Sequence, residues 1–203
     1  TFLSTGAATI DEIEWAVNHF YKNGGKNLTL LQTTAKYPAP LESLNIHSMN
    51  ILKNNFNVPV GLSDHSIDPI IGPVSATALG ASVIEKHFTL NKKLPGPDHS
   101  FALDPNELKE MIKAIRNCEK CLGTEEKIVQ DTEFELRDFA QRSIQCIKNI
   151  SKGELFLEGE NFAILRSGKC NKGIHPKFIE VLEGKISTRS ISIGDGILES
   201  DYE

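Results

Sequence analysis

The sequence predicts an α/β protein with a parallel sheet over residues 1–122, followed by a smaller β-rich domain. Short apolar runs alternate with amphipathic stretches throughout the first 122 residues, which is typical of repeated βα units. Two of the apolar runs end in a histidine, at His65 and at His87. Because the carboxyl ends of parallel strands carry the functional groups of such folds, these two histidines mark the edge where a site is expected.

The elements of this first part are expected in strict alternation. The series Thr9 to Glu12 has the residues of a capping box and begins the first helix. Asp68 and Pro69 begin the third helix, which Pro73 delays or kinks. We expect strands ending or lying at 2–6, 28–33, 58–62 and 82–87, and helices after residue 9, around residue 49, at 68–79 and at 105–122. Four strands and four helices in this order make half of an eight-stranded barrel.

The second part of the chain has a different character. Residues 123–138 are charged and weakly periodic, which indicates a linker. Beyond it, the pattern of residues 150–158 recurs at 191–199, each time as a turn with glycine and an acidic residue followed by a short apolar strand. The repeat predicts a small pseudo-symmetric β domain. A domain of roughly 60 residues has a marginal core, so packing against another domain or subunit would stabilise it.

Composition excludes several classes of protein. A net charge of −5 and a pI near 5.7 argue against a protein that binds nucleic acid. No apolar run approaches the roughly 20 residues of a membrane helix, and the first residues lack a basic region followed by an apolar core. We therefore expect a cytoplasmic protein with no membrane partner. The chain begins with Thr1 rather than methionine, and we expect it to be a fragment.

The two histidines predict a site by their position in the alternation. Glu85 and His87 share one parity and so point to the same side of their strand, whereas Lys86 points to the other side. His65 ends the neighbouring strand, and two such imidazoles could hold one divalent metal. The alternative is a pair of strand-end histidines whose hydrogen bonds are satisfied within the fold.

Five short motifs then allow a resemblance to be stated. They are Ser4-Thr5-Gly6, Tyr37-Pro38-Ala39-Pro40, Gly61-Leu62-Ser63-Asp64-His65, Glu85-Lys86-His87-Phe88-Thr89 and Gly96-Pro97-Asp98. The chain resembles the sialic acid synthase family over essentially its whole length, without the family's first four βα units. The resemblance implies the C-terminal half of a (β/α)8 TIM barrel at 1–122, a linker at 123–138 and an antifreeze-like (SAF) domain at 139–203.

The family condenses phosphoenolpyruvate with an N-acetylated amino sugar to give a nonulosonic acid and phosphate, using a divalent metal that is usually manganese. The resemblance implies N-acetylmannosamine or a 2,4-diacetamido analogue as the sugar, and a domain-swapped homodimer. It also implies roles for nine residues: His65 and His87 as metal ligands, Glu85 as the catalytic residue, Ser4 and Ser63 for phosphoenolpyruvate, and Tyr37, Asp98, Phe139 and Arg166 for the sugar, the last two reaching the site of the partner subunit.

Some features leave alternatives open. Ala35 stands where many members have serine or asparagine, and the loop 168–174 is longer than usual, so contacts to both substrates are in doubt. Gly96-Pro97-Asp98 favours a neuraminic or legionaminic acid synthase, whereas residues 175–178 resemble the pseudaminic acid branch. A different class of function is a non-catalytic carbohydrate-binding or dimerisation fragment. Because the phosphate-binding lysines would lie in the absent part, residues 1–203 alone are expected to have no turnover.

Overall fold

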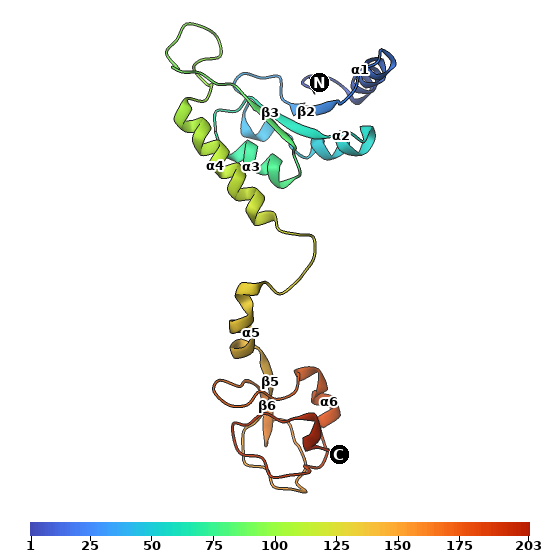
Figure 1. The fold of residues 1–203 in the computed structure, drawn as a ribbon, viewed down its shortest axis with the longest axis vertical. Helices are drawn as coiled ribbons and strands as arrows, with labels where there is room; N and C mark the ends of the chain where they lie inside the picture. Colours follow the sequence, from blue (N-terminus) through green and yellow to red (C-terminus); the bar gives the residue numbers. More distant parts are fainter. The chain divides into compact units, whose positions relative to one another are not determined.

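The computed structural model of the chain describes the backbone of residues 1–203 and all side chains except those of Asp138 and Phe139. The chain forms two compact units, Thr1–Glu125 and Glu126–Glu203, which are described separately (Figure 1). Within the described residues, none of the helices combines the length and apolar character needed to cross a membrane.

The first unit is a four-stranded parallel sheet in which the strand order follows the sequence. Its elements are β1 (Phe2–Ser4), α1 (Ile10–Lys22), β2 (Thr29–Thr33), α2 (Ser48–Phe56), β3 (Val60–Asp64), α3 (Ile71–Ala78), β4 (Val83–Lys86) and α4 (Pro105–Leu122), with a short 3-10 turn at Leu41–Ser43. The predicted α/β fold with a parallel sheet is therefore confirmed. Sequential order is what a run of right-handed βαβ crossovers produces.

The two faces of this sheet have different chemistry. On one face, Leu30, Val60 and Leu62 are buried in a core that also contains Ile13 of α1 and Met49 of α2. Residues of the opposite parity point to the other face, where the register aligns position 31 with 61 and position 63 with 85. Helix packing on one face thus leaves the other face for polar side chains at the strand ends.

Capping residues set the helix boundaries. Thr9 and Glu12 form the predicted capping box of α1, with Thr9 N donating to Glu12 Oε2 at 2.7 Å. Helix α3 begins at Ile71, later than predicted, because Asp68 Oδ1 accepts from the amides of Ile70 at 2.8 Å and Ile71 at 2.7 Å and holds a turn before the helix. Strand β3 in turn runs on to Asp64, beyond its predicted end at residue 62.

The second unit is built from short pairings around an apolar core. Strand β5 (Arg142–Cys146) pairs antiparallel with β6 (Phe162–Arg166). The two copies of the predicted repeat meet directly, since Ile150 N donates to Ile191 O at 2.9 Å and Ile191 N donates to Ile150 O at 2.8 Å. The apolar segments predicted as strands within each copy form isolated bridges instead. The remaining elements are α5 (Phe134–Ala140), α6 (Ile179–Leu182) and 3-10 turns at Asp131–Glu133, Pro176–Phe178 and Glu199–Asp201.

Helix α5 lies mostly within the segment 123–138, which the sequence predicted to be a linker. The turn before it is stabilised by Gln130 N, which donates to Glu133 Oε2 at 2.8 Å. A cap of this kind can begin a helix too short to show apolar periodicity, which is why the charged segment gave no helical signal.

Candidate active site

The carboxyl ends of β3 and β4 bring two of the predicted site residues into contact. Ser63 and Glu85 are paired in the strand register. Ser63 Oγ donates to Glu85 Oε1 at 2.6 Å, and the serine is buried whereas the glutamate is exposed. Adjacent parallel strands place register partners on the same face, so this bond follows from the pairing of the strands.

The two histidines lie one step further along the same face. The ring centroids of His65 and His87 are 5.4 Å apart. His65 Nδ1 is 2.8 Å from the carbonyl oxygen of Thr34, and because a carbonyl can only accept, Nδ1 carries the proton. In the neutral ring, Nε2 is then unprotonated, with Ser63 Oγ at 3.5 Å. The loop after β2 therefore fixes the tautomer of His65.

Tyr37 covers the histidine pair. Its ring stacks on His65 with centroids 4.1 Å apart and lies edge-on to His87 at 5.7 Å. Ala39 N donates to the carbonyl of His65 at 2.9 Å, which joins the tyrosine loop to the end of β3. Tyr37 is 52% exposed, so its outer surface is available to a ligand.

The long loop between β4 and α4 closes the other side of His87. Asp98 Oδ2 is 3.7 Å from His87 Nδ1. The buried ring of Phe101 packs 5.2 Å from His87, and Leu103 N donates to the carbonyl of His87 at 2.8 Å. Phe101 and Thr34 were not predicted from the sequence as residues of the site. The apolar series from Phe101 to Leu103 is a signal of burial, whereas Thr34 acts through its backbone and leaves no signal in its residue type.

The structure thus brings six of the nine predicted site residues together: Tyr37, Ser63, His65, Glu85, His87 and Asp98. Ser4 is exposed in β1, where it pairs with Leu31, and its hydroxyl forms no hydrogen bond with the described side chains of this cluster. Arg166 ends β6 in the second unit, and its Nε donates to the carbonyl of Ala140 at 3.2 Å. The side chain of Phe139 lies outside the described residues.

The histidine pair offers a metal two nitrogen ligands. A hydrogen bond from the distal ring nitrogen to a carbonyl, as between His65 and Thr34, is typical of histidines that bind metals. Among the side chains that the structure describes, no group of three or more histidine, cysteine, aspartate or glutamate residues is arranged to hold a metal ion. Two imidazole nitrogens suit a first-row divalent metal, and the rest of its ligands would have to come from atoms other than these side chains.

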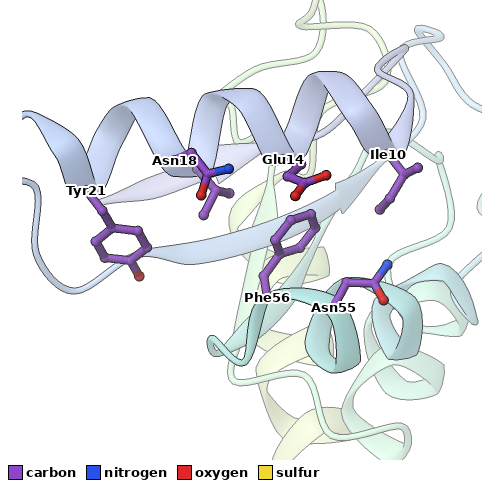
Figure 2. A pocket seen from close by; sticks show the side chains of 7 residues that line it. Ile10, Glu14, Asn18, Tyr21, Asn55 and Phe56 are labelled. Carbon is purple, nitrogen blue, oxygen red and sulfur yellow. The ribbon is translucent and has the colours of Figure 1, made fainter.

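A separate hollow of about 480 Å³ lies between α1 and α2 (Figure 2). Glu14 and Tyr21 project from α1 towards Phe56 at the end of α2. None of the predicted site residues whose side chains the structure describes lines it. The hollow is a gap between neighbouring helices and contributes nothing to the histidine cluster.

Two family models account for almost the whole chain. The model of the NeuB family matches residues 1–127, and that of the SAF domain matches residues 141–203. The chain belongs to the NeuB family. This confirms the resemblance to sialic acid synthases that the five sequence motifs indicated.

Named relatives of this NeuB chain synthesise different sugar acids. It is 42% identical to the N,N'-diacetyllegionaminic acid synthase of Campylobacter jejuni, over 93% of this chain and 55% of that protein. It is 41% identical to the pseudaminic acid synthase of the same species, over 100% of this chain and 57% of that protein. The crystal structure of the spore coat polysaccharide biosynthesis protein SpsE of Bacillus subtilis matches with a TM-score of 0.56 and 39% identity, over 100% of this chain and 60% of that one. The chain spans little more than half the length of these curated relatives.

Proposed function

We propose that this chain supplies the C-terminal half of the (β/α)8 barrel of a nonulosonic acid synthase, which condenses phosphoenolpyruvate with an N-acetylated amino sugar and releases phosphate. The observation that supports this most is the gathering of His65, His87, Tyr37, Ser63 and Glu85 at the carboxyl ends of neighbouring parallel strands. The family membership, and the names of its relatives as synthases of this class, point the same way.

His65 and His87 would hold the divalent metal, proposed to be manganese. When bound, such a metal acts as a Lewis acid that polarises the aldehyde oxygen of the open-chain sugar. The role of the chain is to select the tautomer of His65 whose proton is on Nδ1, because the Thr34 carbonyl accepts from Nδ1 at 2.8 Å and leaves Nε2 of the neutral ring as the nitrogen for a metal.

Ser63 and Glu85 are proposed to act on phosphoenolpyruvate as a pair. The Ser63 hydroxyl proton is directed to Glu85 Oε1 at 2.6 Å, so with ionised Glu85 the serine has no proton left for an anionic substrate. When Glu85 takes up a proton, Ser63 is freed to donate to a carboxylate or phosphate oxygen. Glu85 Oε1 is thus the atom at which a proton is held while Ser63 turns to the substrate.

Tyr37 and Asp98 are proposed to bind the sugar. The exposed side of the Tyr37 ring offers a flat surface and a hydroxyl, and the Asp98 carboxylate can accept from sugar hydroxyls. In the reaction, the enol carbon of phosphoenolpyruvate forms a bond to the aldehyde carbon, whose oxygen takes up a proton. Water adds to the carbon that bears the phosphate and gives up a proton. The bond from that carbon to the phosphate oxygen then breaks, the new hydroxyl loses its proton to become the keto group, and phosphate leaves with the electron pair and a proton. Ser4 as a second phosphoenolpyruvate contact, and Phe139 and Arg166 as sugar contacts across a swapped homodimer, belong to the same proposal.

The decisive experiment is product analysis by mass spectrometry. The complete gene product is incubated with manganese, phosphoenolpyruvate and a panel containing N-acetylmannosamine, a 2,4-diacetamido sugar and a pseudaminic precursor. A nine-carbon keto acid from one sugar establishes the reaction and identifies the branch of the family. Sequence identity does not distinguish the branches, because the chain is 42% identical to a legionaminic acid synthase and 41% identical to a pseudaminic acid synthase. No product from any sugar, with manganese bound, would contradict the proposal. Residues 1–203 alone should give no product.

A further inference from the structure

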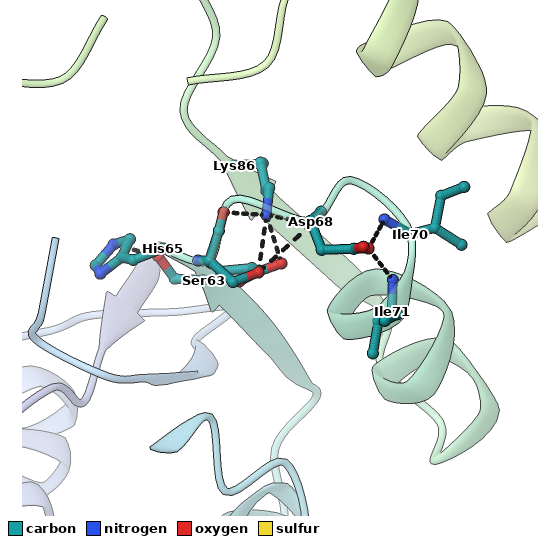
Figure 3. A network of polar contacts seen from close by, with 8 residues as sticks. Ser63, His65, Asp68, Ile70, Ile71 and Lys86 are labelled. Atoms are coloured by element: carbon teal, nitrogen blue, oxygen red, sulfur yellow. Dashed lines mark hydrogen bonds and ion pairs between the residues drawn. The ribbon is translucent and has the colours of Figure 1, made fainter. Parts of the chain in front are cut away.

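Lys86 is buried on the helix-facing side of the sheet, directly behind the site. Its Nζ donates to Asp64 Oδ2 at 2.7 Å, to the carbonyls of Ser66 at 2.6 Å and Asp68 at 2.9 Å, and lies 3.2 Å from Ser66 Oγ. Figure 3 shows this fan of bonds between β4 and the turn that follows β3. The side chains of Lys86 and Asp64 are 3% and 0% exposed. An ammonium with this many acceptors is fully satisfied without water.

The position of this pair in the strand register connects it to the site. Asp64 and Lys86 are register partners, one residue beyond the pair Ser63 and Glu85. Side chains alternate along a strand. Ser63 and Glu85, and the two histidines that follow, therefore point to the site face, whereas Asp64 and Lys86 point away from it. A slip of one residue between these strands would exchange the two faces. The buried ion pair therefore opposes such a slip from behind the site.

The pair also holds the turn that follows His65. Asp64 Oδ1 accepts from Ser66 N at 2.8 Å. The first turn of α3 lies directly against the same carboxylate, since a Cβ on Gly72 would stand 2.6 Å from Asp64 Oδ2. Lys86 therefore joins β4 to both ends of this turn, at Asp64 and at Asp68.

We propose that Lys86 and Asp64 are positioning residues: they hold the end of β3 and its turn so that His65 Nδ1 meets the Thr34 carbonyl and Nε2 lies beside Ser63 Oγ. A buried ion pair is often no more stabilising than apolar side chains of the same shape, so stability alone gives little reason for one here. The link to metal binding rests on the proposed function, whereas the placement of His65 does not.

The test uses the complete gene product and separates stability from geometry. Lys86→Met leaves Asp64 as an unpaired buried charge, whereas Lys86→Met with Asp64→Asn removes both charges at nearly constant shape. Lys92→Met is the matched control, because Lys92 forms an ion pair with Glu107 at 2.6 Å in the same unit but is about one-third exposed. The readouts are thermal unfolding, the ¹⁵N chemical shifts of the His65 imidazole without metal, and the affinity for manganese.

In the single variant we expect a lower melting temperature, a mixed His65 tautomer and manganese affinity weaker by about 10- to 100-fold, as for residues that support metal ligands. The double variant should recover much of the melting temperature but neither the single His65 tautomer nor the manganese affinity. Lys92→Met should change none of them. Lys86→Arg keeps the charge and should therefore lose less stability than Lys86→Met, but it should still disturb the tautomer, since a planar fork cannot reproduce all the ammonium contacts.

If the double variant recovers both its stability and the original His65 tautomer, the proposal is overturned. A folded Lys86→Met protein with an unchanged His65 signal would overturn it as well. If the unaltered protein does not bind manganese, the proposed function fails. The metal-free His65 signal still decides the role of Lys86 in that case. If the charge-removing variants do not fold, the His65 signal of Lys86→Arg decides it in the same way.

Discussion

Each of the two units contains a buried carboxylate paired with a basic side chain, and the two pairs stabilise different parts of the structure. Asp64 and Lys86 are both enclosed, directly behind the histidine cluster. Asp201 is 1% exposed, whereas its partner Arg189 is 49% exposed and binds it with two nitrogens, at 2.7 and 2.8 Å. The first pair joins the strands that carry a site. The second stabilises the 3-10 turn Glu199–Asp201.

The comparison teaches that the surroundings of an ion pair decide what its loss affects. Asp201 Oδ2 also accepts from Leu198 N at 2.9 Å, which closes the last 3-10 turn, so the pair with Arg189 stabilises this part of the second unit. Loss of the Arg189 pair should therefore reduce the stability of the second unit. Loss of the Lys86 pair should alter the histidine site even where stability is restored.

The largest effect is expected from the site itself. His65→Ala, and separately His87→Ala, should abolish manganese binding and lower turnover about a thousandfold, because Lewis-acid assistance contributes several kcal/mol to the transition state. Isothermal titration with manganese and steady-state kinetics of the complete gene product provide the measurement. His47→Ala is the control, since His47 is exposed and lies outside the cluster. Unchanged manganese affinity in both variants would remove the metal from the proposed mechanism.

The next effect concerns the second unit. Arg189→Met leaves the Asp201 carboxylate buried without its base and should lower the free energy of unfolding of this unit by about 2 kcal/mol, below the value for a fully buried pair because Arg189 is half exposed. Chemical denaturation of the complete gene product, followed in residues 126–203, measures this free energy of unfolding. Arg116→Met, which breaks an exposed pair with Glu119, should have little effect.

The same pair predicts how stability depends on pH. Burial raises the pKa of Asp201, but the bonds from Arg189 and Leu198 N outweigh it, and the pKa is lowered overall. The unfolded chain then binds the proton more tightly, so the stabilisation is present above a pH of about 4 and is lost as pH falls through the lower pKa of the folded protein. Unfolding curves between pH 7 and acid should show this loss, and Asp201→Asn should flatten it.

Sequence reasoning reached the site because its residues obey strand alternation. The parity of Glu85 and His87, and the opposite direction of Lys86, are confirmed. It ended β3 too early because buried Asp64 breaks the apolar pattern, and its burial depends on a lysine 22 residues later. Contacts through the backbone, such as the Thr34 carbonyl, carry no residue signal at all. Patterns formed by residues close together in the sequence could be predicted from residue types, whereas pairings between side chains on different strands could not.

Cysteine labelling gives a finer view of the two units. Burial raises the pKa of Cys146 to about 11, so its thiolate is scarce, whereas Cys121 and Cys170 are exposed. Iodoacetamide should label the exposed pair quickly and Cys146 only when the second unit opens. Arg189→Met should speed labelling of Cys146 by roughly 30-fold, the equivalent of about 2 kcal/mol. Lys86→Met should leave that rate unchanged if the two units respond separately.

The smallest effect is expected from Ser63→Ala. The variant removes one hydroxyl from the site face but leaves the Asp64 and Lys86 pair behind it intact. Loss of one hydrogen bond to a charged substrate should raise the KM for phosphoenolpyruvate about tenfold. The KM for the sugar should stay near its original value, because Ser63 contacts Glu85 and not Tyr37 or Asp98. Equal increases in both KM values would mean that Ser63 orients the whole strand end. The positioning role proposed for Asp64 and Lys86 would then belong to Ser63.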